Sequence, residues 1–146
     1  MKALRDLSSV IIPAFLLLLL TGCFRARTRK LLEQKRWYVV NVTPPDEGGF
    51  NIEMFDKARD LKNGFYKGSW FYFGKDSLFE ACFQGKIDTG KYALGADGRV
   101  LSLFPKKGGP IYEQIQIQQL SDSTFDFNTV ISSFKMTLHL KTRPGI

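Results

Sequence analysis

Histidine and cysteine are scarce in this sequence of 146 residues, which contains one histidine and two cysteines. A structural zinc site needs four nitrogen or sulfur ligands, so these residues cannot supply one, and we expect no metal. No nucleophile–base pair and no paired carboxylates stand out either. This shortage predicts a protein that is not an enzyme and has no catalytic residues.

A run long enough to cross a membrane as a helix is also missing. The apolar run Val10–Leu20 has 11 residues, whereas a bilayer needs about 20. With the basic residues before it, this run is typical of a secretory signal peptide. It leads into Leu20-Thr21-Gly22-Cys23, which resembles the bacterial lipobox, where small residues precede a cysteine that is acylated. We therefore predict a lipoprotein signal peptide over residues 1–22 and a covalent lipid on Cys23, with no other cofactor.

The net charge of +7 is unevenly distributed. Residues 24–36 carry six basic residues and one acidic residue, whereas residues 37–146 carry thirteen basic and twelve acidic ones. The excess belongs to a short arm beside the anchor, within reach of lipid phosphates. We therefore interpret residues 23–36 as a lipidated basic tether and expect no nucleic-acid partner. Phe24 and the absence of acidic residues directly after it favour an outer-membrane anchor that faces the periplasm over one at the cell surface.

Residues 37–146 show the alternation and turn residues of a β protein. Eight strands with short connections predict an all-β domain, an antiparallel up-and-down barrel of about eight strands, because closure removes exposed edges. An open or split barrel is the alternative. A helical turn is expected at 30–35, and 46–66 is expected to be a loop with a possible helical turn at 52–61. The predicted strands are 37–42, 70–73, 77–84, 86–94, 99–104, 111–120, 124–130 and 134–141.

Strict alternation assigns faces within these strands. In the first strand it places Trp37 and Val42 on opposite faces. In the last strand four apolar residues alternate with polar ones, which places His139 on the solvated outer face. Cys82 lies in an apolar run and is predicted to be a buried small side chain. With Cys23 acylated, Cys82 has no disulfide partner.

Four stretches of the chain carry a further likeness. A helical turn leads into a tryptophan-bearing strand at 31–40, and an aromatic strand ends in a Gly/Asp turn at 70–76. A Gly-Lys-Tyr stretch follows at 88–92, and a Gln/Ile-rich strand, a Leu-Ser-Asp-Ser turn and the next strand cover 115–127. In these features residues 31–143 resemble the lipocalin-like small lipoproteins of Bacteroidetes.

This resemblance implies a lipocalin-like barrel, with an apolar cavity or with an interior filled by side chains. It also implies that a base from the last strand, Arg143 or Lys141, packs on Trp37 and closes one end of the barrel. Inward-facing aromatic residues would line the cavity if it is open. The candidate ligand-binding residues are Trp70, Tyr72, Phe83 and Tyr92.

Two functions follow from these features. The first is an accessory or interaction subunit of an envelope assembly, such as a secretion system, held at the membrane by its lipid. It is favoured because no polar constellation stands out that would orient a ligand. The alternative is a lipocalin-like carrier of a small apolar ligand or lipid. A cavity of roughly 300 Å³ or more favours the carrier, and a filled barrel with an exposed apolar patch favours the protein partner.

Overall fold

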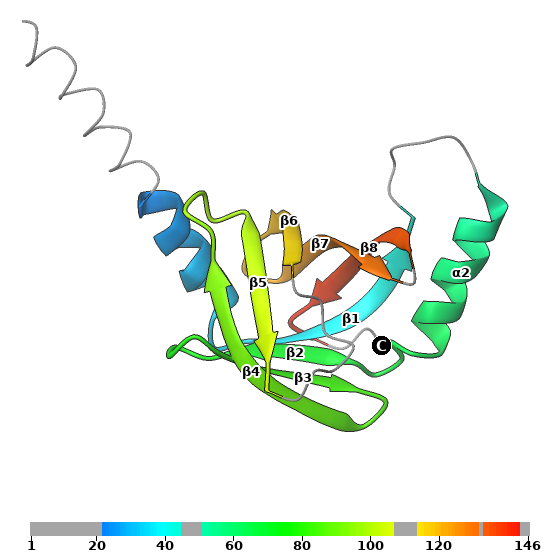
Figure 1. Ribbon diagram of the computed structural model, residues 1–146, viewed down its shortest axis with the longest axis horizontal. Helices are drawn as coiled ribbons and strands as arrows, with labels where there is room; N and C mark the ends of the chain where they lie inside the picture. The colour runs from blue at the N-terminus through cyan, green and yellow to red at the C-terminus, as the bar shows by residue number, and fades with distance from the viewer. Residues whose placement is uncertain (1–21, 45–50, 107–113, 132, 144–146) are drawn as a thin grey trace, which may run out of the picture.

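The computed structural model describes residues 22–44, 51–106, 114–131 and 133–143. Eight strands form one closed sheet in which each strand pairs antiparallel with the next, and β8 pairs with β1 (Figure 1). The predicted all-β, up-and-down barrel is therefore confirmed. The strands are β1 (Arg36–Thr43), β2 (Trp70–Phe73), β3 (Leu78–Phe83), β4 (Lys86–Leu94), β5 (Val100–Pro105), β6 (Gln114–Leu120), β7 (Thr124–Ile131) and β8 (Phe134–Lys141).

Two glycines, one in the turn between β3 and β4 and one in β4, stand at positions that do not suit a larger residue. Gln84 and Gly85 have φ of 50° and 78°, as in the two-residue turns that match the twist of a β-hairpin. A Cβ on Gly90 would overlap the carbonyl oxygen of Phe104 and would lie 2.6 Å from the Phe79 ring. Gly90 therefore lets the strands and the interior ring approach closely.

β1 contains an irregularity that changes which residues face the interior. Val39 pairs with Leu140 of β8, but the next pair is Asn41 with His139, so one residue is left over. A bulge of this kind reverses the facing of the residues that follow it. Trp37 and Val42 are both buried, so the expectation that they lie on opposite faces is wrong.

The stretch before β2 holds a regular helix, α2 (Ile52–Asn63), of 12 residues. The possible helical turn expected at 52–61 lies within this helix, which is longer than expected, and the loop expected around it is wrong over 52–63. The side chain of Asn51 accepts hydrogen bonds from the backbone N–H groups of Glu53 and Met54, at 3.0 and 3.4 Å, which caps the helix N-terminus. Ala58 is the buried residue of α2, so the helix presents only a narrow apolar face to the barrel.

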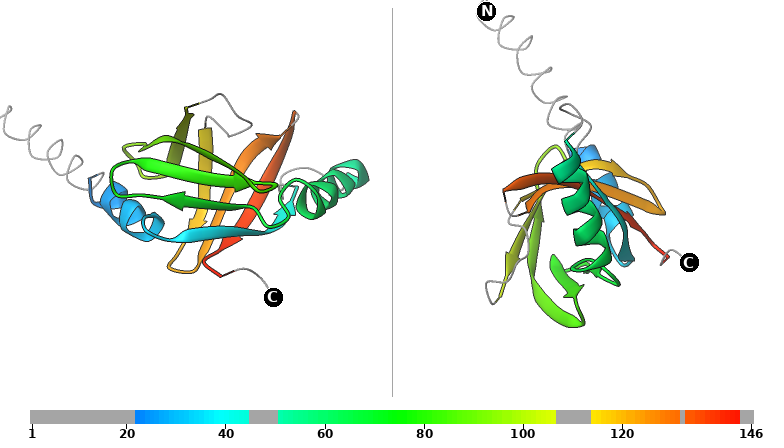
Figure 2. Two further views of the ribbon diagram at one scale, coloured as in Figure 1. Left: turned by 90° about the horizontal axis from the view of Figure 1, so that it is seen from below. Right: turned by 90° about the vertical axis from the view of Figure 1, so that its right-hand side faces the viewer.

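A further helix, which we call the N-terminal helix, covers residues 22–32. It begins eight residues before the expected turn at 30–35. Leu32 at its end is fully buried. The turn between β4 and β5 also touches it, because a Cβ on Gly98 would lie 2.8 Å from Thr28 Oγ1 and 3.1 Å from the Phe24 carbonyl oxygen. The helix of residues 22–32 and α2 lie at opposite ends of the barrel (Figures 1 and 2). The described part of the predicted tether is thus largely a helix docked on the barrel.

Aromatic side chains occupy the barrel interior. Ring centroids lie 5.6 Å apart for Trp37 and Phe125, and 5.9 Å apart for Phe71 and Phe127. At the α2 end, Phe83 contacts two rings of the α2–β2 connection at 5.2 and 5.9 Å. These rings form one buried cluster with aliphatic residues of the other strands. The fully buried aromatic residues are Trp37, Tyr66, Phe71, Phe73, Phe79, Phe125 and Phe127.

Candidate functional site

The four candidate ligand-binding residues separate into two pairs. Phe83 and Tyr92 are buried and belong to the interior cluster. Trp70 and Tyr72 are half-buried and alternate with the inward-facing Phe71 and Phe73 along β2. Trp70 and Tyr72 therefore lie on the outer wall, and the four residues do not line one cavity.

Trp37 is fully buried, and the base over its ring is not the one that the resemblance implies. Its indole Nε1 donates a hydrogen bond to the Leu32 carbonyl oxygen at 3.0 Å. The cation over its ring is Lys35, whose Nζ lies 5.8 Å from the ring centroid and 3.0 Å from Asp122 Oδ1. Arg143 is exposed beyond β8, so among the described residues Lys35 takes the place that we expected for Arg143.

An apolar row crosses the outer wall of β1–β4. Tyr38 pairs with Trp70, Trp70 with Cys82, and Cys82 with Ile87. We call these four residues the outer stripe. Cys82 is buried, as predicted, and Ile87 is 58% exposed. The Arg36 guanidinium lies 4.2 Å from the Trp70 ring centroid, so a cation covers the Trp70 part of the stripe.

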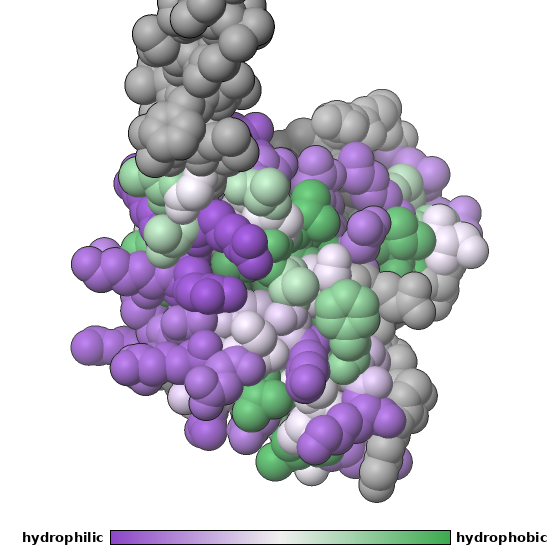
Figure 3. Space-filling view, turned by 60° about the vertical axis from the view of Figure 1, so that its left-hand side comes forward, coloured by the Kyte–Doolittle hydropathy of each residue, from purple (hydrophilic) through white to green (hydrophobic). Residues whose placement is uncertain are grey.

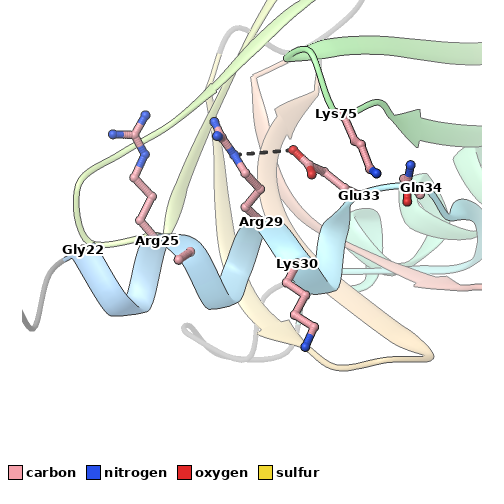
Figure 4. A pocket seen from close by; sticks show the side chains of 8 residues that line it. Gly22, Arg25, Arg29, Lys30, Glu33, Gln34 and Lys75 are labelled. Carbon is pink, nitrogen blue, oxygen red and sulfur yellow. Dashed lines mark ion pairs between the residues drawn. The ribbon is translucent and has the colours of Figure 1, made fainter.

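A pocket of about 620 Å³ lies beside the N-terminal helix. Arg25 and Arg29 extend from the same side of the helix, and Lys75 reaches in from the turn between β2 and β3 (Figure 4). Cys23, the predicted lipidation site, is exposed on the same helix. We call this the basic pocket. It is lined by Arg25, Ala26, Arg29, Lys30, Glu33, Gln34 and Lys75, and also by Gly22, the last residue of the predicted signal peptide.

Glu33 is the one carboxylate in that lining, and two groups already engage it. Arg29 Nε lies 3.4 Å from Glu33 Oε1, and the Tyr92 hydroxyl donates a hydrogen bond to the same oxygen at 2.6 Å. Burial and this hydrogen bond raise the pKa of Tyr92 well above its ordinary value. The lining of the basic pocket therefore has an excess of positive charge. Figure 3 shows hydrophilic side chains over much of the face that it brings forward.

A second polar constellation, which the sequence analysis missed, spans β1, β8 and β7. His139 Nδ1 lies 3.2 Å from Asp126 Oδ1, and Nε2 lies 2.9 Å from Thr43 Oγ1. His139 is on the outer face, as predicted, but it is partnered and not simply solvated. The hydroxyl–imidazole–carboxylate order is that of a catalytic triad. None of the three residues lines the pockets described here, and the group joins three strands across the bulge of β1.

Two further pockets border described residues. One of about 400 Å³ lies between β1 and the α2–β2 connection, and one of about 410 Å³ lies between the N-terminal helix, the β4–β5 turn and β6. Within the described ranges, no group of three or more His, Cys, Asp or Glu residues is placed to hold a metal ion. In the same ranges, neither helix has the length and hydropathy to span a membrane.

The comparisons with known proteins show a likeness in fold. No protein-family model matches the chain, and no curated protein matches it. The crystal structure of a DUF4847 family protein from Bacteroides vulgatus resembles it with a TM-score of 0.56 and 11% sequence identity. The match covers 81% of this chain and 99% of that chain. The resemblance to Bacteroidetes barrels is thus supported at the level of the fold, and the lipobox stays a prediction.

Proposed function

We propose that this chain is a non-catalytic interaction subunit, anchored by a lipid on Cys23 in the outer membrane and facing the periplasm. In this role it binds a protein of an envelope assembly, such as a secretion system. The observation that carries the proposal is the distribution of aromatic residues. Rings fill the barrel interior, while the outer stripe presents Trp70 and the exposed Ile87 on the outside.

The filled interior weakens the alternative of a carrier. A ligand pocket buries most of a small molecule in a cavity of roughly 300 Å³ or more. Here the Phe127 ring contacts both Phe71 and Phe125 in the interior. Trp70 and Tyr72, which a carrier would need inside, lie on the outer wall. The aromatic residues therefore favour contact with a partner over the enclosure of a ligand.

The docked helix supports an anchored subunit with a defined orientation. Cys23 lies at the start of a helix whose Leu32 is fully buried in the barrel. Acyl chains on Cys23 would thus connect to the barrel through a packed helix rather than a flexible linker. Such an anchor gives the acyl chains a defined position relative to the barrel.

Metabolic labelling tests the anchor. Cells that express the full chain are grown with an alkyne analogue of palmitate, and the purified protein is examined for label. We expect label on the wild type and none on Cys23→Ala. Cys82→Ala is the matched control, because Cys82 is buried and its loss should leave labelling unchanged. An unlabelled wild type would overturn the anchor.

Site-specific photo-crosslinking tests the protein partner. A photoreactive amino acid replaces Ile87 or, as control, Val130, which is 63% exposed compared with 58% for Ile87. Val130 is on β7, away from the outer stripe. In outer membranes of the native cell we expect a discrete protein adduct from position 87 and none from position 130. Equal adducts from both positions, or none from position 87, would contradict a partner on the outer stripe.

A further inference from the structure

We propose that the basic pocket binds the phosphate group of an anionic lipid in the membrane to which Cys23 is attached. This inference rests on the proposed lipid anchor and adds a second, non-covalent contact with the same membrane. Two elements of the chain build the site. Arg25 and Arg29 are one helical turn apart on the helix of residues 22–32, and Lys75 belongs to the turn after β2 (Figure 4).

The charge of the lining favours a bound anion. Four cations and one carboxylate border the pocket, and the carboxylate, Glu33, already has Arg29 and Tyr92 as partners. Among the described residues, no carboxylate pairs with Arg25, Lys30 or Lys75. Like charges that border the same pocket repel one another. A phosphate relieves that repulsion, and a guanidinium matches its oxygens with two parallel hydrogen bonds.

The position of the pocket favours a lipid phosphate over a free one. An α-helix rises 1.5 Å per residue, so Arg25 and Arg29 lie about 3 and 9 Å from Cys23 along the helix axis. Each headgroup layer of a bilayer is about 5–8 Å thick. With the acyl chains on Cys23 inserted in the hydrocarbon and the helix along the membrane normal, Arg25 lies within the headgroup layer and Arg29 at its outer border.

Occupation of the pocket has a consequence for the barrel. The acyl chains alone leave it free to rotate about the anchor. A lipid phosphate bound in the basic pocket adds a second point of attachment beside Cys23 and so restricts this rotation. The outer stripe, which begins at β1 and β2, then has a narrower range of directions relative to the membrane plane.

Native mass spectrometry in mild detergent tests the site. The lipoprotein is purified from cells that express the full chain. The probes are phosphatidylglycerol, phosphatidylcholine and inorganic phosphate. Wild-type protein should retain one phosphatidylglycerol in preference to phosphatidylcholine. Arg25→Gln with Lys75→Gln should lower that retention at least about tenfold. Both residues are exposed, so the change should leave the fold intact, which circular dichroism checks.

The matched control is Lys62→Gln with Lys67→Gln. It removes the same charge from another pocket, at the α2 end of the barrel, and should retain phosphatidylglycerol like the wild type. Equal loss in both double variants, or no preference for phosphatidylglycerol in the wild type, would overturn the proposal. Displacement of the lipid by low concentrations of inorganic phosphate would also overturn it, in favour of a free-anion site. The intact mass reports acylation of Cys23 separately, so retained lipid on an unacylated protein supports the pocket while it refutes the anchor.

Discussion

At the scale of single residues, Tyr92 joins the barrel to the N-terminal helix. Its hydroxyl donates to Glu33 Oε1 at 2.6 Å, with the Gly74 carbonyl oxygen as a second acceptor at 3.0 Å. Tyr92→Phe removes the donor and leaves the Glu33 carboxylate short of a partner. We expect a loss of about 1–3 kcal/mol in the free energy of unfolding at pH 7, measured by urea denaturation. Tyr72→Phe on the outer wall is the control and should change stability little.

The raised pKa of Tyr92 gives this prediction a pH dependence. In the unfolded chain the phenol ionises near pH 10, whereas burial and Glu33 keep it protonated to higher pH in the folded chain. The stability that depends on the protonated hydroxyl is therefore complete below pH 10 and is lost as the pH rises towards the folded-state pKa. The stability difference between wild type and Tyr92→Phe should shrink from about pH 10 to about pH 12. A difference that stays constant over this range would contradict the assigned cause.

The sequence was least informative about which side chains point into the barrel and which point outward. Trp70, Phe71, Tyr72 and Phe73 are four successive aromatic residues, so hydropathy does not say which pair faces inward. The register with β1 decides it, because Phe71 pairs with the inward-facing Trp37 and Trp70 pairs with Tyr38. Likewise, no local signal marks the bulge that turns Val42 inward. His139 was placed on the correct face, but its partners come from two other strands, and Asp126 and Thr43 are distant in sequence.

At the scale of elements, the strands were predictable because their alternation and turn residues are local. β2, β4 and β8 have the bounds expected from the sequence. α2 was recognised only as a possible helical turn, because its contribution to the core is the small Ala58, which leaves a weak apolar periodicity. Its usable signals were at its ends: Asn51 before it, Glu53 in its first turn and Lys62 in its last turn.

The cap of α2 provides a test at this scale. Asn51→Ala removes the acceptor for the N–H groups of Glu53 and Met54 and should cost the helix about 1 kcal/mol. Because few α2 side chains are buried, we expect the effect as local opening. Amide hydrogen exchange should be roughly fivefold faster in α2 and unchanged in β7 and β8. Asn51→Asp should keep the protection, since aspartate caps equally well and suits the helix dipole. Faster exchange throughout the barrel would show that α2 is not an independent unit.

At the scale of the whole molecule, aromatic rings pack inside the barrel, and the described pockets border its outside. Sequence composition alone left this open, because thirteen phenylalanines are compatible with a lined cavity or with a packed core. The structure places the basic pocket and the outer stripe on the outside of the barrel. The interior rings pack against the inner face of the same strands. The two features call for different ligands, since one is cationic and the other apolar.

The filled interior can be tested with a small apolar probe. Phe127 contacts the rings of Phe71 and Phe125, at 5.9 and 5.0 Å between centroids. Phe127→Ala deletes one phenyl ring and should cost about 3–5 kcal/mol, leaving an apolar hole of benzene size that stays dry and binds benzene. Benzene should therefore raise the melting temperature of Phe127→Ala by several degrees and leave that of the wild type unchanged. If that variant does not fold, Leu138→Ala, on the β8 residue that pairs with Phe127, makes a smaller hole. Stabilisation of the wild type by benzene would instead reveal a pre-existing cavity, and the carrier function would then be preferred.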